Sequence, residues 1–414
     1  MTFKAFLSTQ ADDITDEEAA LKYTEYKLEF RRQQLNEFFS NHKDSEWFQQ
    51  RYHPQLSKKR EEELRDRVKK RLTIFRELES VGLMDRLSLQ SVNDLELIKL
   101  LNTVVIKLEG GGEDDLKILD IDNDTSTATE KDRELHLTSS IFLPLLSPAV
   151  THSELEAVSE NYPGYLRLSL SPPDQTKSWT RRAWITFERK AKIKEVNLEI
   201  SLYMINNFVF QICFRLNSVR LRGKDLKPLV NKDLSKRIRS SSAVSSDQKI
   251  ARNDIKVAAK IISNLDRKHG LWVDVNNPLL SSASDYLIDE IAAEEEELLS
   301  KAVDSTETVE NHDTARDLDV NEEVLKVLDK LILYLRIVHS TDYYSSAQYP
   351  LEDEMPNRLG LLHVRETLDR GLQLSGAEAD RLNTEKGLKV RHLTRTPTTL
   401  QEEEAAKLGE AWRI

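Results

Sequence analysis

The most apolar helical pattern in the chain lies in residues 323–338. Apolar side chains recur there at spacings of three and four, which predicts a helix with a wide apolar face. Val327, Leu333 and Ile337 fill much of the remaining circumference. Pro350 and Pro356 follow and prevent the helix from resuming nearby. We therefore expect a central helix that packs against helices from both flanks and makes one body with them.

The first 120 residues read as an all-helical N-terminal domain. A capping-box pattern, Thr15 followed by Glu18, opens a helix that we expect to reach about residue 41. Two further helices, at 58–80 and 92–109, have apolar residues along one face. Three glycines at 110–112 end the third helix, and a polar linker follows at 121–135.

The pattern changes to short strands in residues 136–235. We expect strands at 140–143, 165–170, 181–187 and near 219–222, with helices at 153–161 and from about 192. In this order the elements form βαββαβ, the ferredoxin-like layout of an RNA-recognition motif (RRM). The whole chain is therefore predicted to be an α+β protein, a mostly α-helical body with a central RRM-like domain.

Helical periodicity returns in residues 236–360, which we expect to form a helical C-terminal domain. A flexible serine-rich joint at 240–246 precedes amphipathic helices at 249–265 and 286–299. Residues 303–320 are polar and predicted to be disordered. Beyond residue 360 the apolar pattern weakens, so residues 361–414 read as a weakly ordered tail with a last short helix at 402–408.

Charge is unevenly distributed along the 414 residues. The net charge is −11, yet residues 136–240 have 17 Lys and Arg against 9 Asp and Glu, and residues 281–323 have 2 against 15. The basic segment suggests an anionic partner. The single cysteine, Cys213, excludes an internal disulfide and fits a reducing compartment. No signal peptide opens the chain and no apolar run is long enough to span a bilayer, so we expect no membrane partner.

No arrangement of residues predicts catalysis. The sequence has no phosphate-binding glycine loop and no Gly-x-Ser-x-Gly elbow. Four glutamates at 294–297 could serve a metal-dependent nuclease, but neighbours on a helix point in different directions, and a solvated acidic face is the simpler interpretation. His339 with Asp342 could form an acid–base pair, yet no nucleophile accompanies them. We expect a protein that is not an enzyme and needs no metal or cofactor.

The residues with binding chemistry lie on the two middle strands of the predicted sheet. An RRM stacks bases on aromatic side chains there, because any base has a π-face. Phe142 occupies the first stacking position, and alternation along 181–187 turns Arg182, Trp184 and Thr186 outward. Trp184 can stack on a base, and the guanidinium of Arg182 can stack or contact phosphate. Further cations are candidates to line the backbone path: Lys177, Arg220, Arg222 and Lys224.

Two departures from the usual RRM pattern leave the role of the sheet open. Arg181 stands where a glycine is usual, and Leu145 stands where an asparagine is common. Degenerate RRMs often bind protein or have a covered sheet. Weak, largely sequence-independent RNA binding and a covered, non-binding sheet are therefore both open.

Four long segments of the chain resemble segments of one protein family, and they occur in the same order as in that family. They are YKLEFRRQQLNEFFSNHKDSEWFQQRYHP at 26–54, ARNDIKVAAKII at 251–262, DYLIDEIAAEEEELL at 285–299, and LDKLILYLRIVHSTDYY with YPLEDEMPNR at 328–358. They resemble the Serrate (arsenite-resistance protein) family. The resemblance implies a nuclear scaffold that links the cap-binding complex on capped transcripts to microRNA-precursor processing and to other RNA maturation or decay machinery. An alternative is a helical interaction scaffold whose RRM-like domain does not bind RNA.

The chain also departs from that family. Residues 196–211 interrupt the expected second helix of the RRM-like domain, and their ends can be encoded as GTAAAT and TTTCAG, the ends of a short nematode intron. We hypothesise that this segment is a translated intron in a nematode-type member. The family's C-terminal zinc finger needs two cysteines, whereas this chain has Cys213 alone. We therefore expect a shortened form in which partner contacts that run through the finger are reduced.

Overall fold

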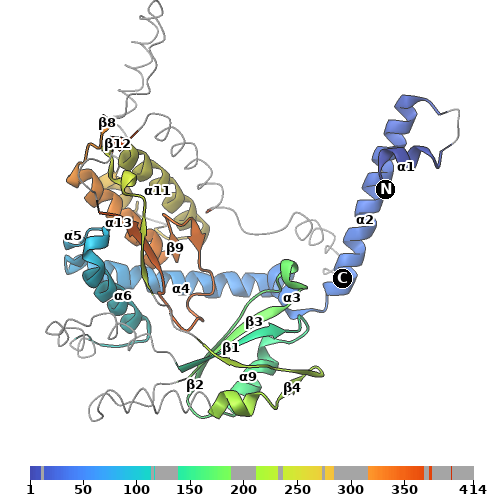
Figure 1. Cartoon of the computed structure of the whole chain (residues 1–414), viewed down its shortest axis with the longest axis horizontal. Coiled ribbons are helices and arrows are strands. Elements are labelled where there is room, and N and C mark those ends of the chain that lie inside the picture. The colour runs from blue at the N-terminus through green and yellow to red at the C-terminus, as the bar shows by residue number, and fades with distance from the viewer. Residues whose placement is uncertain are drawn as a thin grey trace, which may run out of the picture. The chain divides into compact units, whose positions relative to one another are not determined.

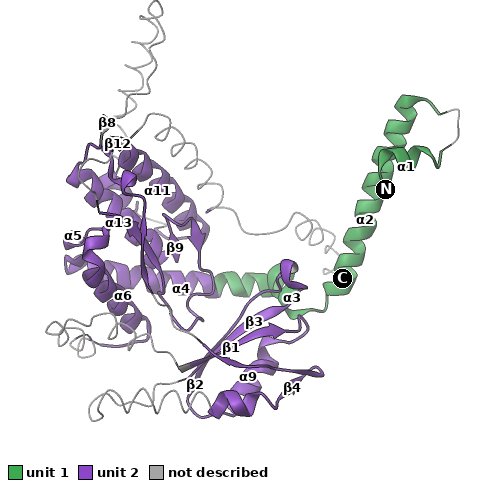
Figure 2. Cartoon of the chain, in the orientation of Figure 1, with its two compact units in different colours: residues 1–62, 396–414 green, residues 63–395 purple. Residues whose placement is uncertain are grey.

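The computed structural model describes residues 1–10, 14–112, 116, 139–187, 211–231, 236–272, 276–283, 316–367, 373–374 and 393 (Figure 1). The chain divides into two compact units, residues 1–62 with 396–414 and residues 63–395 (Figure 2). These units do not follow the predicted domain boundaries, because residues 63–108 share a core with residues from 238 onward.

The described residues of the first unit form three helices and the start of a fourth. They are α1 (Phe3–Leu7), α2 (Asp16–His42), α3 (Glu46–Tyr52) and α4 (Pro54–Ser80), the last of which continues into the second unit. The Thr15 hydroxyl accepts the backbone N–H of Glu18, which confirms the predicted start of α2. Trp47 and Phe48 are buried, and the Phe48 ring packs edge-to-face against Phe38 and Phe39 of α2.

Helix α13 (Glu322–Val338) is the centre of the helical part of the second unit. One core joins it to α4, α5 (Leu83–Arg86), α6 (Asp94–Leu108) and α11 (Gln248–His269). Leu328 and Ile337 are fully buried although they point to nearly opposite sides of the helix. The expected central helix, packed by helices from both flanks, is therefore confirmed. We refer to this part as the helical core.

The non-helical segments of the helical core are joined to one another by pairs of short strands. β7 (Ile238–Ser241) pairs in parallel with β11 (Leu362–Arg365), and β9 (Thr341–Asp342) pairs with β10 (Ala347–Gln348). β8 (Arg316–Asp317) pairs with β12 (Gln373–Leu374). The prediction of a flexible joint at 240–246 is therefore wrong, since Ser240 and Ser241 are in a strand and Val244 is buried. β7 and β11 are more than 100 residues apart in the sequence, and pairing over that separation leaves no local sequence pattern.

The RRM-like domain contains a four-stranded sheet in the order β2-β3-β1-β6. Its strands are β1 (Ser139–Leu146), β2 (Tyr165–Leu170), β3 (Arg181–Phe187) and β6 (Leu229–Val230), and α9 (His152–Glu160) packs on one face. Residues 211–216 are helical and contribute Ile212 and Leu216 to the same core. The α+β fold class is confirmed.

One predicted strand of this domain is wrong. Residues 219–222 do not form the edge of the sheet, because β4 (Arg220–Leu221) folds back on β5 (Lys224–Asp225) as a separate hairpin. Leu229 and Val230 occupy the edge instead, beside Phe142 and Ile141. Several other expectations lie outside the described residues: the insert from 196 to 210, the helix at 286–299 with its four glutamates, and the short helix at 402–408.

Candidate nucleic-acid interface

Phe142 and Trp184 lie side by side on the outer face of the sheet, away from α9. Strand register places them opposite each other, with ring centroids 5.2 Å apart and planes inclined by 30°. Ile141, Leu143, Ala183 and Ile185 alternate with them and are fully buried on the opposite face. The apolar core therefore fixes the two strands, and the two-residue period turns both rings outward. Both rings are half-buried.

Other outward residues extend this pair across the sheet. Leu229 of β6 lies next to Phe142 and is 54 % exposed. Arg182 lies two residues before Trp184 on the same face of β3 and is half-buried. We call Phe142, Arg182, Trp184 and Leu229 the outer strip. It combines apolar rings with one cation, which is the composition that stacks bases without reading their sequence.

Lys177 lies in the loop that leads into β3, close to Asp174. Hydrogen bonds from Thr176 lower the pKa of Asp174, and the positive charges of Lys177 and Arg182 lower it further. Lys177 is exposed, and Arg182 is near enough to act on the same carboxylate. The structure therefore brings Lys177 to the end of the outer strip where Arg182 lies.

The other end of the same face is covered by the helical core. Arg167 of β2 donates to the carbonyls of Met355 and Pro356, at 3.3 and 3.1 Å, and Ser169 contacts the Met355 sulfur at 3.5 Å. Ser169 is fully buried and Thr186 is only 2 % exposed. The strand register confirms that Thr186 faces outward, beside Arg167, but Thr186 is buried there.

The β4–β5 hairpin lies apart from the outer strip. Arg222 pairs at 2.7 Å with Glu154 of α9, on the opposite side of the sheet from Phe142 and Trp184. A backbone hydrogen bond from Thr151 and the charge of Arg222 both lower the pKa of Glu154. Arg220 pairs at 2.7 Å with Asp225 inside the hairpin. The role of Arg220 and Lys224 in lining an RNA path stays a prediction.

The predicted pair of His339 and Asp342 is wrong, because each residue has another partner. His339 Nε2 lies 2.8 Å from Asp266 of α11, and Asp342 lies 2.8 Å from His363 Nδ1 of β11. Both contacts join segments of the helical core. Across the described residues, no group of three or more His, Cys, Asp or Glu side chains could hold a metal ion.

Three residues that shape this face were hard to predict from the sequence. Leu229 follows Pro228 in a short apolar stretch that could have suggested an edge strand. Arg167 interrupts the leucines of β2, and such a charge in an apolar strand indicates an outward position. Nothing in the local sequence marks Met355 as the residue that covers Ser169.

Family comparisons agree with this architecture. Residues 4–113 match the model of the SERRATE/Ars2 N-terminal domain, and residues 135–211 match the RNA-recognition domain of the Serrate RNA effector molecule homologue. The chain belongs to the Serrate family. The two matched ranges correspond to the helical N-terminal part and to the RRM-like domain that carries the outer strip.

Serrate relatives are similar over nearly the whole chain. Serrate RNA effector molecule homolog B of Xenopus laevis is 32% identical over 99% of this chain and 62% of its own length. The Caenorhabditis elegans homolog is 35% identical over 91% of this chain and 60% of its own length, and the human homolog is 30% identical over 99% and 62%. The chain therefore spans about three fifths of the length of these relatives.

A solved plant structure is also similar to this chain, at a low level. An Arabidopsis Serrate structure, described as giving insights into miRNA processing, aligns with 99% of this chain and 73% of its own at 15% identity and a TM-score of 0.25. A likeness at that score carries no weight for the fold. Helices in the described part of this Serrate chain are all too short or too polar to cross a membrane.

Proposed function

We propose that this Serrate protein is a non-catalytic nuclear adaptor that joins capped transcripts to RNA-processing machinery. Its partners would be the nuclear cap-binding complex and the machinery of microRNA processing, with links to other maturation or decay pathways. Membership of a family whose relatives are named RNA effector molecules supports this role. A helical core that gathers distant segments around α13 suits a scaffold.

We further propose that the RRM-like domain contacts single-stranded RNA through the outer strip. The stacked pair of Phe142 and Trp184 carries this proposal, since two half-exposed rings beside Arg182 offer a platform for bases. Stacking contributes about 1–3 kcal/mol per base, so two rings support weak binding with little sequence preference. Lys177 at the end of the strip would contact the phosphate backbone.

Fluorescence anisotropy of the full chain with single-stranded RNA across a salt series tests this proposal. Trp184→Ala and Phe142→Ala should each weaken binding by roughly 5- to 160-fold, the loss of one stacked base. Phe214→Ala is the matched control, because Phe214 is 76 % exposed but lies outside the sheet. Equal affinities for the wild type and all three variants would exclude the outer strip as an RNA platform.

The covered end of the sheet favours a second candidate function. Met355 and Pro356 already occupy the face over Ser169 and next to Arg167, so the remaining strip is narrow. An RRM-like domain with a partly covered sheet can be a structural part of a protein-binding scaffold that meets RNA only through its partners. Unchanged RNA affinity in Trp184→Ala, combined with normal recovery of protein partners, would favour this candidate.

A further inference from the structure

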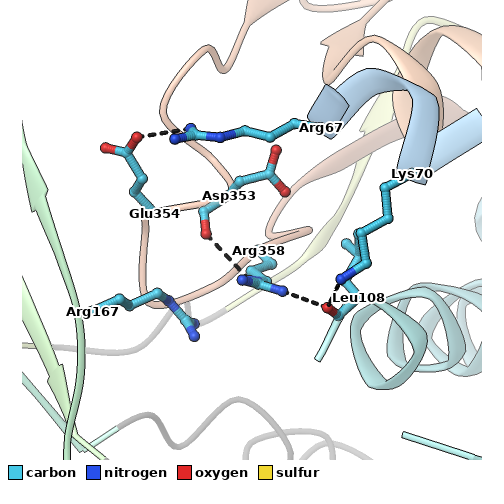
Figure 3. A pocket seen from close by; sticks show the side chains of 7 residues that line it. All are labelled: Arg67, Lys70, Leu108, Arg167, Asp353, Glu354 and Arg358. Carbon is cyan, nitrogen blue, oxygen red and sulfur yellow. Dashed lines mark hydrogen bonds and ion pairs between the residues drawn. The ribbon is translucent and has the colours of Figure 1, made fainter. Parts of the chain in front are cut away.

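A pocket of about 280 Å³ lies where the RRM-like domain meets the helical core (Figure 3). Four cations line it: Arg67 and Lys70 of α4, Arg167 of β2, and Arg358 after α13. Asp353, Glu354 and Leu108 complete the lining. Figure 3 shows these side chains entering from separate segments of the chain and converging on one space. We call it the junction pocket.

Both carboxylates that line the pocket are neutralised by partners of their own. The carboxylate of Asp353 binds the guanidinium of Arg71 at 2.8 Å, and Arg71 is only 1 % exposed. Glu354 pairs with Arg67 at 2.7 Å. Each of these two pairs is close to electrically neutral, so Asp353 and Glu354 offset little of the charge on the remaining cations, although Asp353 still favours the charged form of Arg167.

Two cations of the pocket, Arg167 and Arg358, share one carboxylate, and Lys70 adds a third positive charge. Glu109 lies 3.0 Å from Arg167 and 3.4 Å from Arg358, while Lys70 donates to the carbonyl of Leu108 at 2.9 Å. Three positive charges against one negative charge leave an excess of two. Arg358 also donates to the carbonyl of Leu108, at 2.7 Å, so the end of α6 holds two of these cations close together.

The positive charge of a neighbouring arginine affects the pKa of Arg167. Burial lowers its pKa, and the nearby charge of Arg358 lowers it further, while Glu109 opposes both effects. An ammonium group has three donors, of which Leu108 takes one from Lys70. An anion in the junction pocket would therefore meet further donors and relieve repulsion between the two guanidinium groups.

We propose that the junction pocket binds a phosphate group of single-stranded RNA whose bases stack on the outer strip. Arg167 of β2 lies opposite Thr186, two residues along β3 from Trp184, and all three face the same side of the sheet. Strand geometry separates Arg167 from Trp184 by about 8 Å. An extended RNA strand can span that separation between a stacked base and a neighbouring phosphate.

This inference rests on the proposed RNA-binding function and adds a second contact to it. The pocket would fix the path of the backbone past the covered end of the sheet, while the rings hold the bases. Phosphate contacts position a nucleic acid without reading its sequence. A phosphorylated peptide offers the same chemical group, but the neighbouring stacking surface favours RNA.

Lys70→Gln is the variant that tests the junction pocket. Lys70 is exposed and its hydrogen bond goes to a helix-end carbonyl, so the substitution should leave folding intact. We expect the full chain to bind a mixed-sequence single-stranded RNA several-fold more weakly in fluorescence anisotropy. The slope of log affinity against log salt should fall by about 0.7, the value for one lost phosphate contact.

Two further variants control for general loss of charge. Lys69→Gln removes the same charge from the next residue of α4, which is exposed and does not line the pocket, and it should retain wild-type affinity and salt slope. Lys70→Arg keeps the charge in the pocket and should also retain both. Equal losses in Lys69→Gln and Lys70→Gln would overturn the proposal, because they would indicate non-specific attraction.

The outcomes separate this proposal from the function on which it rests. If Trp184→Ala weakens binding and Lys70→Gln does not, the outer strip binds RNA and the junction pocket proposal is overturned. If the full chain binds no RNA at all, both are overturned. A fluorescent phosphoserine peptide is the second arm, and binding of this peptide that needs Lys70 while RNA binding does not would assign the pocket to protein ligands.

Discussion

The helical core and the β4–β5 hairpin of the RRM-like domain place arginines that pair with carboxylates in different environments. In the helical core Arg71, Arg336 and Arg365 are at most 1 % exposed, and each is paired with a carboxylate. In the RRM-like domain Arg220 and Arg222 are 73 % and 52 % exposed, although each also has a carboxylate partner. In the helical core, buried ion pairs join distant segments of the chain. In the hairpin, the arginines are exposed to solvent, where a ligand can contact them.

These three pairs all tie α4 or α13 to the segment that follows α13, which includes β11. Arg71 of α4 reaches Asp353, Arg336 of α13 reaches Glu352, and Asp329 of α13 binds Arg365 of β11 at 2.6 Å. This segment also supplies Met355 and Pro356, which cover the end of the sheet. The same ion pairs that stabilise the helical core therefore position the cover over the RRM-like domain.

Arg365→Met should have the largest effect on stability. It leaves Asp329, which is 2 % exposed, with a buried charge and no guanidinium partner. Breaking a buried pair in this way costs about 3–5 kcal/mol. Urea unfolding followed by far-UV circular dichroism measures the loss as a lower midpoint with an unchanged slope.

A double variant tests whether the loss of stability in Arg365→Met comes from the unpaired, buried charge of Asp329. Arg365→Met combined with Asp329→Leu removes both charges and should recover part of the lost stability, because apolar pairs often replace buried ion pairs. Recovery should be incomplete, since Asp329 also accepts the backbone N–H of Leu89. A loss below about 1 kcal/mol in the single variant would contradict the difference drawn between the two regions.

The same difference explains what could be predicted from the sequence. Strands β2 and β3 were predicted with their observed bounds, because the two-residue alternation of apolar and polar side chains is a local property of the sequence. The outward positions of Phe142 and Trp184 on the two middle strands were predicted from strand order and alternation in the same way, whereas the contact between the two rings was not predicted. The pairing of β7 with β11 and the contact of Arg167 with Met355 join residues more than 100 positions apart, and no local period encodes them.

His269 provides an intermediate test of the helical core through its pH dependence. Burial lowers the pKa of His269 to about 4, and the facing His339 and Lys268 lower it further, as does Arg65, whereas Asp266 raises it. The unfolded state therefore takes up a proton below about pH 6.5 while the folded state does not. Stability is fully present above that pH and falls as the pH drops toward 4.

The expected size is modest because the His269 side chain is only half-buried. Solvent screening reduces the effect of its pKa shift to about 1 kcal/mol between pH 7 and pH 4. In His269→Gln, the decrease in unfolding free energy between pH 7 and pH 4 should be smaller than in the wild type by about 1 kcal/mol. His152→Gln is the matched control in the RRM-like domain, where His152 pairs with Glu156 on the surface of α9, and it should leave the pH dependence unchanged. An equal change in both variants would refute the assignment to His269.

Arg222→Ala should have the smallest effect, and it tests the exposed side of the comparison. The pair of Arg222 and Glu154 lies on the surface, so its loss should cost at most about 0.5 kcal/mol of stability. Arg222 also lies on the α9 side of the sheet, so RNA affinity should change less than twofold, whereas Arg182→Ala on the outer strip should weaken binding several-fold. An RNA loss in Arg222→Ala that matches Arg182→Ala would mean that the backbone passes around the sheet edge beside β6, and the exposed cations of the hairpin would then belong to the RNA path.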